Sequence, residues 1–321
     1  MQKWMQQSFS AIRSVLPSTA RTCWWMVRLT VGVSFLVFLL DYFRLLPYFS
    51  EWLQPVFSTL GLPGEAALAY VSGYFVNVYS AIAVGVTLDL GPRAMTILGV
   101  MVLCSHNMFV ETAIQRKTGT PWVRTVVVRT LSGILLALAL NLVLPPEDVV
   151  EMTGASAVFA AADGVAEAGV TFGEAFWAWA QTTLKLAAKM ALLIFLLNIL
   201  QKLLAEFGVT QALSRILAPF LRVFGLPARC SFLWIVANTL GLAYGGAAML
   251  EEVERGDLSQ EDIDLLNLHI GISHSNLEDL VLIASIGAIW WIVLLSRWIL
   301  SLLLVWGYRA WLHLHSSHVS A

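Results

Sequence analysis

The chain has 321 residues, of which 58% are hydrophobic and 12% are charged, and its mean hydropathy is +0.76. Soluble domains carry roughly 25% charged residues, so this composition excludes a soluble enzyme and a secreted disulfide scaffold. A net charge of −2 provides no basic field for nucleic acid. The composition predicts an all-α, polytopic membrane protein whose first partner is the lipid bilayer.

The N-terminal segment differs from the rest of the chain. Over residues 1–20, apolar side chains recur at helical spacing, with Lys3, Gln6, Gln7 and Arg13 between them. This pattern predicts an amphipathic helix on the membrane surface. The first membrane span is expected to follow at 24–46.

The chain then divides into two similar halves. Residues of the first half recur in the same order in the second, at an offset of 164 and later of 168. The matches are Pro55 with Pro219, Gly61-Leu62-Pro63 with Gly225-Leu226-Pro227, Ser105-His106 with Ser273-His274, Glu111 with Asp279, and Arg129 with Arg297. We therefore predict an internal repeat with halves at 21–145 and 182–312, a linker at 146–181 and a tail at 313–321.

Each half has the same predicted order of segments. These are a long apolar helix (24–46; 183–205), an amphipathic segment broken by proline (48–60; 210–224), a stretch rich in small residues (66–88; 230–250) and two further helices (94–115 and 124–144; 265–289 and 292–312). Charge indicates whether the small-residue stretch crosses the membrane. If it crosses, the basic loops 116–124 and 202–229 lie outside, against the positive-inside rule. If it is a hairpin, these loops are cytoplasmic and the linker, with six acids and no Lys or Arg, lies outside.

The sequence thus predicts two inverted repeats, each with three transmembrane helices and one re-entrant helical hairpin. The protein is expected in a bacterial inner membrane, with both termini on the cytoplasmic side. Hairpin tips inside a bilayer must be covered by protein or face a water-lined cavity, and the predicted tips carry suitable polar residues. These are Asn77 and Ser80 in the first half, and Asn238, Thr239 and Tyr244 in the second. Inverted halves with interrupted helices are typical of secondary transporters.

Ionisable residues inside membrane segments are costly and are often functional. The candidate site residues form matching groups in the two halves: Ser105, His106, Asn107 and Glu111, and Ser273, His274, Ser275, Asn276, Glu278 and Asp279. His274 and Glu278 are four apart and therefore share a helical face. His106 and Glu111 are five apart and would meet only if the helix is partly unwound.

Other readings of these residues stay open at this point. A single buried Ser or Asn often only joins helices. Arg129 and Arg297 are candidate counter-ions in either a structural or a functional role, and Arg116 competes for Glu111. His269 is expected to face the same cavity. Imidazoles with carboxylates bind transition metals or carry protons, and the spacing matches no metal motif.

The segments Asn238–Ala247 and Leu266–Asp279 resemble the nucleoside-recognition, or Gate, domain family. That family includes the spore maturation proteins A and B and the gate regions of ferrous-iron transporter B, and is related in fold to concentrative nucleoside transporters. The resemblance is clearer in the second half. It implies that hairpin tips and Ser-His helices form the site and that transport is elevator-like. The chain lacks the GTPase and cysteine-bearing gate motif of the iron transporters.

No nucleophile elbow, P-loop or nucleotide fingerprint is present, so we expect neither an enzyme nor a cofactor. The first hypothesis is a secondary-active, proton- or ion-coupled transporter of a small polar solute such as a nucleoside or nucleobase. The alternatives are a divalent-metal permease and a non-transport membrane scaffold or accessory protein. A homodimer is one expected form, since a partner copy would supply a fixed scaffold.

Overall fold

A computed structural model describes residues 2–43, 45–88, 90–146, 171–256 and 258–319. Within these ranges the structure is helical and contains no strand, as the composition predicts. Five helical segments are long and apolar enough to cross a membrane: Ser8–Leu40, Pro92–Lys117, Trp122–Val143, Phe172–Glu206 and Trp290–Leu314. Most of the predicted acidic linker, residues 147–170, lies outside the described residues.

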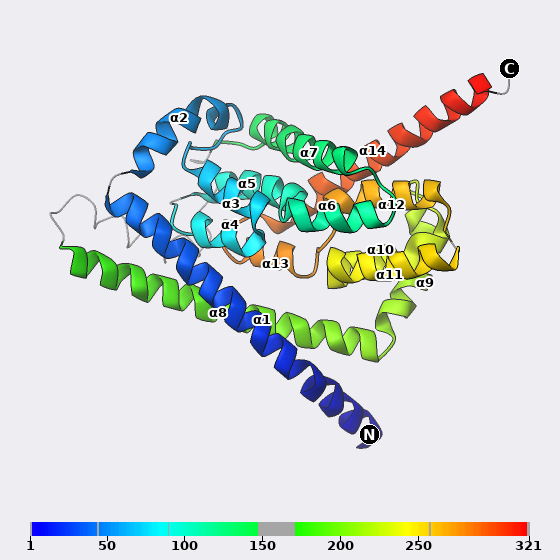
Figure 1. Ribbon diagram of the computed structural model, residues 1–321, viewed down its shortest axis with the longest axis horizontal. Helices are drawn as coiled ribbons and strands as arrows, with labels where there is room; N and C mark the ends of the chain where they lie inside the picture. Colours follow the sequence, from blue (N-terminus) through cyan, green and yellow to red (C-terminus); the bar gives the residue numbers. More distant parts are fainter. Residues whose placement is uncertain (1, 44, 89, 147–170, 257, 320–321) are drawn as a thin grey trace.

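The helices follow the chain in two sets. The first set is α1 (Gln2–Tyr42), α2 (Leu46–Thr59), α3 (Ala66–Phe75), α4 (Val78–Gly85), α5 (Pro92–Ser105), α6 (Met108–Lys117) and α7 (Trp122–Val143). The second is α8 (Phe172–Glu206), α9 (Val209–Leu221), α10 (Ser231–Leu240), α11 (Leu242–Arg255), α12 (Gln260–Ser273), α13 (Asp279–Ala284) and α14 (Trp290–Val319). In Figure 1 the long helices α1 and α8 cross on one side of a body made by the shorter ones.

Several predicted boundaries fall inside helices. The predicted surface helix 1–20 and the first span are one continuous helix, because Pro17 lies within α1 without ending it. Pro55 likewise lies inside α2. Beyond the predicted tail boundary at 312, α14 continues to Val319, and no Gly or Pro after Gly307 stops it. The predicted crossing 265–289 is split into α12 and α13, each too short to span a bilayer of about 30 Å.

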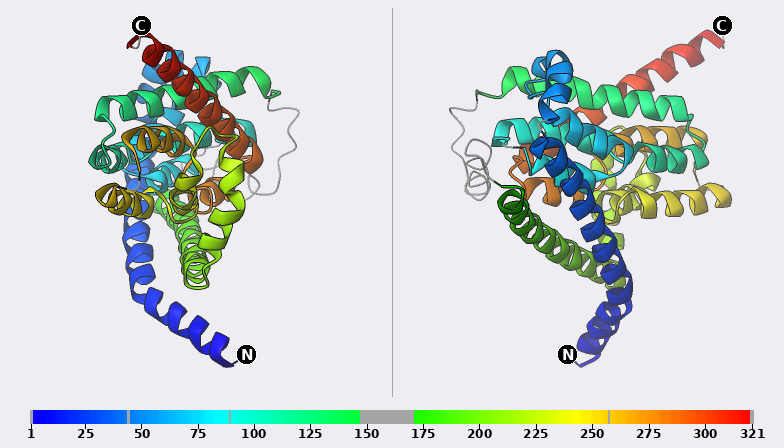
Figure 2. Two further views of the ribbon diagram at one scale, coloured as in Figure 1. Left: turned by 90° about the vertical axis from the view of Figure 1, so that its right-hand side faces the viewer. Right: turned by 60° about the vertical axis from the view of Figure 1, so that its left-hand side comes forward.

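The two small-residue stretches both form helical hairpins, α3–α4 and α10–α11. In the first, a Cβ placed on Gly73 would lie 2.9 Å from the Cβ of Ala81; in the second, a Cβ on Gly245 would lie 3.0 Å from that of Ala237. Each pair brackets its tip symmetrically, at Asn77 and at Gly241, so the paired helices run antiparallel. Figures 1 and 2 show the two hairpins toward opposite ends of the molecule. Their re-entrant position in a membrane stays a prediction.

Replacing Gly73 with valine is expected to destabilise the protein by about 1–3 kcal/mol, the usual cost of overpacking. The added side chain has no space, since even its Cβ would overlap Ala81 of the facing helix. Gly32→Val in α1 is the matched control, because no atom lies within 4 Å of the added Cβ there. Thermal unfolding in detergent measures both variants, and equal midpoints would contradict the close hairpin packing.

The contacts of the two halves repeat at the offsets found in the sequence. In each half, a break between two helices is bound by the preceding hairpin and by an arginine on the last helix of that half. The equivalent bonds are Asn107 N to Gly73 O (3.0 Å) with Ser275 N to Ala237 O (3.1 Å), and Arg129 Nε to Cys104 O (2.9 Å) with Arg297 Nε to Ile272 O (2.7 Å). The internal repeat is therefore present in the contacts as well as in the sequence.

Asp262 lies outside the candidate membrane spans, in a capping box that starts α12. Its Oδ2 accepts hydrogen bonds from Ser259 N (2.8 Å) and Ser259 Oγ (2.6 Å), and pairs with Arg229 at 2.6 Å. Burial opposes the charge on Asp262, but the bonds from Ser259 and Arg229 outweigh it and hold its pKa below the ordinary value. The ionised carboxylate is therefore bound more strongly in the folded state.

Asp262→Asn is expected to cost about 1 kcal/mol at pH 7, the usual worth of a helix cap. Because the folded pKa is depressed, this stabilisation is present above the unfolded aspartate pKa of about 3.9 and is lost as pH falls through the lower folded pKa. The gap between wild type and variant should therefore shrink in unfolding measurements between pH 7 and about pH 3. A gap that is constant over this range would contradict the assignment.

Candidate functional site

Two helix breaks form the centre of the structure, one in each half. After α5 the chain is extended at His106 and left-handed at Asn107, with φ 50°. After α12 it is extended at His274 and left-handed at Ser275, with φ 57°. Asn visits this region more readily than most residues. The partial unwinding expected beside His106 is thus present, and it recurs at the equivalent place in the second half.

Buried arginines bind the carbonyls that each break leaves without a helical partner. Arg129 donates to His106 O (2.9 Å), and Arg297 donates to His274 O (2.7 Å). Arg297 also reaches Leu103 O of the first half at 3.4 Å. The two guanidinium groups are 1% and 0% exposed. Because buried carbonyls require donors, these arginines stabilise the non-helical backbone at both breaks.

Four ionisable side chains meet between the breaks, and we call His106, Glu111, His274 and Asp279 the junction cluster. His106 Nε2 lies 3.2 Å from both Glu111 Oε1 and Asp279 Oδ2. His274 Nε2 lies 3.2 Å from both carboxylate oxygens of Glu111. The two rings are 5.2 Å apart, and none of the four residues is more than 7% exposed.

The contacts across the junction cluster are reciprocal. His106 of the first half contacts Asp279 of the second, and His274 of the second contacts Glu111 of the first. These residues are equivalent in the repeat. Reciprocal contacts between equivalent residues are the mark of an approximate twofold axis. These contacts bring the two histidine rings together where the halves meet, and the inverted relation of the halves stays a prediction.

Glu111 also pairs with a buried arginine. Arg129 lies 2.6 Å from Glu111 Oε2. The competing arginine from the sequence, Arg116, is exposed at the end of α6. Arg297, the second candidate counter-ion, binds backbone carbonyls and Asn276 Oδ1 (3.3 Å) instead. The two equivalent arginines therefore differ in role, since one neutralises a carboxylate and the other fixes the backbone.

Glu278 lies away from the position that its spacing predicted. His274 and Glu278 would share a face of a continuous helix, but α12 ends at Ser273 and the chain turns before α13. Glu278 instead accepts a hydrogen bond from Tyr79 on α4 (2.5 Å) and one from Gln201 on α8 (3.3 Å). The pairing of His274 with Glu278 was wrong. Glu278 connects the first hairpin to the long helix of the second half.

His269 is also separate from the junction cluster. Its Nδ1 lies 3.2 Å from Trp234 Nε1 and 2.8 Å from Ser273 Oγ. Phe224 packs edge-on against its ring, with 4.8 Å between centroids. The expectation that His269 faces the same cavity as His274 was wrong, because this side chain on α12 packs against aromatic rings from the turn after α9 and from α10.

The remaining predicted site residues make local contacts near the breaks and tips. Asn276 Nδ2 donates to Asn238 Oδ1 at 2.5 Å and so joins the second break to the second hairpin. Four others bond within their own segments: Asn77 with Ser80 (3.0 Å), Ser105 with Met101 O (2.7 Å), Thr239 with Ile235 O (2.7 Å) and Ser273 with His269 O (2.9 Å). Ser105 also donates to Tyr70 Oη on α3 (3.2 Å). The side chain of Tyr244 lies outside the described part of the structure.

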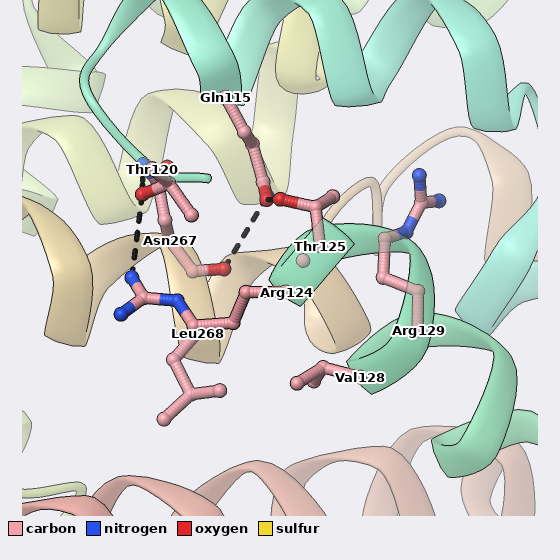
Figure 3. Close-up of a pocket in the computed structure, with 9 residues that line it drawn as sticks. Gln115, Thr120, Arg124, Thr125, Val128, Arg129, Asn267 and Leu268 are labelled. Carbon is pink, nitrogen blue, oxygen red and sulfur yellow. Dashed lines mark hydrogen bonds between the residues drawn. The ribbon is translucent and has the colours of Figure 1, made fainter. Parts of the chain in front are cut away.

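A small pocket lies beside the junction cluster and is lined in part by Arg129, which pairs with Glu111 of the cluster. Figure 3 shows its lining side chains, which come from α6, α7, α12 and the turn before α7. Asn267 donates to Thr118 Oγ1 (2.8 Å) and Thr120 Oγ1 (2.9 Å), while its buried Oδ1 has no partner within the described residues. Sequence reasoning missed Asn267 and Gln115, although Asn267 is an amide within the largely apolar run of residues 265–272.

The fold and this buried polar site define a multi-pass membrane protein. The sequence pattern of the nucleoside-recognition (Gate) family matches residues 23–116, which confirms the resemblance. The match covers the first half, with its hairpin and Ser-His break, whereas the sequence analysis found the clearer resemblance in the second. The chain is similar to the uncharacterized membrane protein YvoD of Bacillus subtilis (strain 168), 29% identical over 277 residues, which are 86% of this chain and 87% of that protein. No solved structure matches.

Proposed function

We propose that this protein is an ion-coupled secondary transporter of a small polar solute, with nucleosides and nucleobases as the first candidates. The observation that carries the proposal is the junction cluster, which buries two histidines and two carboxylates from both halves at one point. Burying ionisable groups in a membrane segment is costly, and such groups commonly mark ion and substrate pathways.

The position of the cluster supports a role in alternating access. The pairs His106–Asp279 and His274–Glu111 each join one half to the other, whereas the pair Arg129–Glu111 lies within the first half. A movement of one half against the other would therefore break the first two contacts and keep the third. A ligand held between the halves would favour one arrangement through its differential affinity, as expected of a site at a repeat junction.

The hairpins and the family match support the class of solute. The amide pair Asn238–Asn276 places donors and acceptors next to the second break, and amides of this kind suit the polar edges of a base or a ribose. The family pattern that matches residues 23–116 is described as nucleoside recognition. We infer that the solute binds between the hairpin tips and the junction cluster.

Uptake of labelled nucleosides and nucleobases into proteoliposomes tests the proposal. We expect Asp279→Asn to reduce uptake more than tenfold, since the variant removes the negative charge through which Asp279 of the second half contacts His106 of the first. Asp264→Asn is the matched control, because Asp264 lies near the start of α12, away from the cluster, and pairs there with Arg124. Absence of uptake for every solute of this class, or uptake that is unchanged in Asp279→Asn, would contradict the proposal.

A further inference from the structure

Three atoms of the junction cluster lie close enough together to be candidate ligands of one metal ion. His106 Nε2, His274 Nε2 and a carboxylate oxygen of Asp279 all lie within 4.8 Å of one another. His106 Nε2 and Asp279 Oδ2 are 3.2 Å apart. Two ligands bound at about 2.0–2.1 Å to a tetrahedral ion are about 3.3 Å apart. One pair thus has the required spacing already, and the third atom is within reach after a small adjustment.

The second nitrogen of each histidine is held in the way that metal ligands usually are. His106 Nδ1 lies 3.2 Å from Val102 O, and His274 Nδ1 lies 2.7 Å from Ile270 O. A carbonyl only accepts, so each Nδ1 carries a hydrogen. Such a bond fixes the orientation of the ring and directs Nε2 at the metal. In both halves the bond joins the histidine to the carbonyl of the residue four positions earlier, so the two rings are held in the same way.

These contacts require either a proton on each Nε2 or a cation between the atoms. In the neutral ring with its hydrogen on Nδ1, Nε2 is an acceptor, and it faces carboxylate oxygens that are also acceptors. Acceptors facing one another at 3.2 Å repel. Arg129 already pairs with Glu111, and the donors of Arg297 are directed at carbonyls and Asn276. One divalent ion supplies the same charge as two added protons and satisfies both rings and Asp279 together.

We propose that the junction cluster binds a single divalent transition-metal ion through His106 Nε2, His274 Nε2 and the Asp279 carboxylate. Two imidazoles and one carboxylate suit ions such as Zn²⁺, Co²⁺, Mn²⁺ and Fe²⁺, and suit Mg²⁺ and Ca²⁺ poorly. Since the ligands come from both halves, the ion joins the halves and leaves when they separate. Its role as the coupling ion rests on the proposed function, whereas its binding does not.

Cobalt titration of the purified, tag-free and chelator-stripped protein tests the site. Tetrahedral Co²⁺ with nitrogen and oxygen ligands absorbs visible light, so the spectrum reports coordination as well as binding. We expect one Co²⁺ per chain, and at least a tenfold loss of affinity in His274→Ala and in Asp279→Asn. If either variant does not fold, His106→Gln gives the same test.

The C-terminal histidines provide the control for incidental binding. A variant with His313, His315 and His318 all changed to alanine should keep the cobalt spectrum and the stoichiometry. Absence of binding in the wild type, or loss of the spectrum in this variant alone, would overturn the proposed site.

Uptake assays separate this inference from the proposed function. Cobalt binding without solute uptake would keep the metal site and reject the transporter. Solute uptake by chelator-stripped protein that does not bind cobalt would keep the transporter and reject the metal site.

Discussion

Arg129→Ala is expected to lower the free energy of unfolding by about 3–5 kcal/mol, the usual cost of removing one partner of a buried ion pair. The substitution leaves the Glu111 carboxylate, which is 5% exposed, without its closest cation. It also removes the donors to Cys104 O and His106 O at the first helix break. Both effects act on the same turn of chain, so we expect this to be the most destabilising substitution in the first half.

Two controls identify the cause of the loss. Arg116→Ala removes an exposed arginine from α6 and should change stability by less than about 0.5 kcal/mol. Combining Arg129→Met with Glu111→Gln removes both charges and should recover part of the stability, because contacting residues are not additive. Denaturant unfolding in detergent measures all three proteins. Equal losses for Arg129→Ala and Arg116→Ala would show that the buried pair does not stabilise the fold.

The features that could be predicted from sequence are those with a repeated local signal. The apolar run 124–144 predicts α7, observed at Trp122–Val143, within two residues. The mirrored Ser-His groups predict one polar site shared by the two halves, and the five-residue spacing of His106 and Glu111 indicates the helix break that lets these two side chains meet. Each of these inferences needs only composition or spacing along one segment. They also agree in the two halves, which makes a chance match improbable.

The features that sequence reasoning missed depend on the path of the backbone after a break. The spacing of a continuous helix places Glu278 beside His274. The left-handed residue Ser275 ends the helix between them, so the two side chains no longer share a helical face. His269 was placed in the cavity because it lies near His274 in the sequence, yet its neighbours Phe224 and Trp234 come from the turn after α9 and from α10. No local pattern reports such contacts. Asn267 carried a usable signal, since a buried amide within the largely apolar run of residues 265–272 needs a hydrogen-bond partner.

The inverted repeats and their orientation in the membrane stay predictions, and two features of the structure bear on them. The turn before α7 and the start of α12 lie together, where Arg124 pairs with Asp264, and Arg229 pairs with Asp262 nearby. The hairpins lie toward opposite ends of the molecule (Figure 1). If basic loops face the cytoplasm, the first hairpin enters from outside and the second from inside.

Cysteine labelling is expected to give an all-or-none result for this arrangement. In a cysteine-free background, Lys117→Cys and Arg215→Cys should react with a membrane-impermeant reagent only after the cells are opened, whereas Glu51→Cys should react in intact cells. All three side chains are exposed, so the side of the membrane, rather than burial, decides the reaction. Labelling of position 117 or 215 together with position 51 in intact cells would require parallel halves. The reciprocal contacts of the junction cluster would then arise from a twofold axis along the membrane normal. The helices of each hairpin would also have to cross the whole membrane, and α3 and α4, at 10 and 8 residues, are too short to do so.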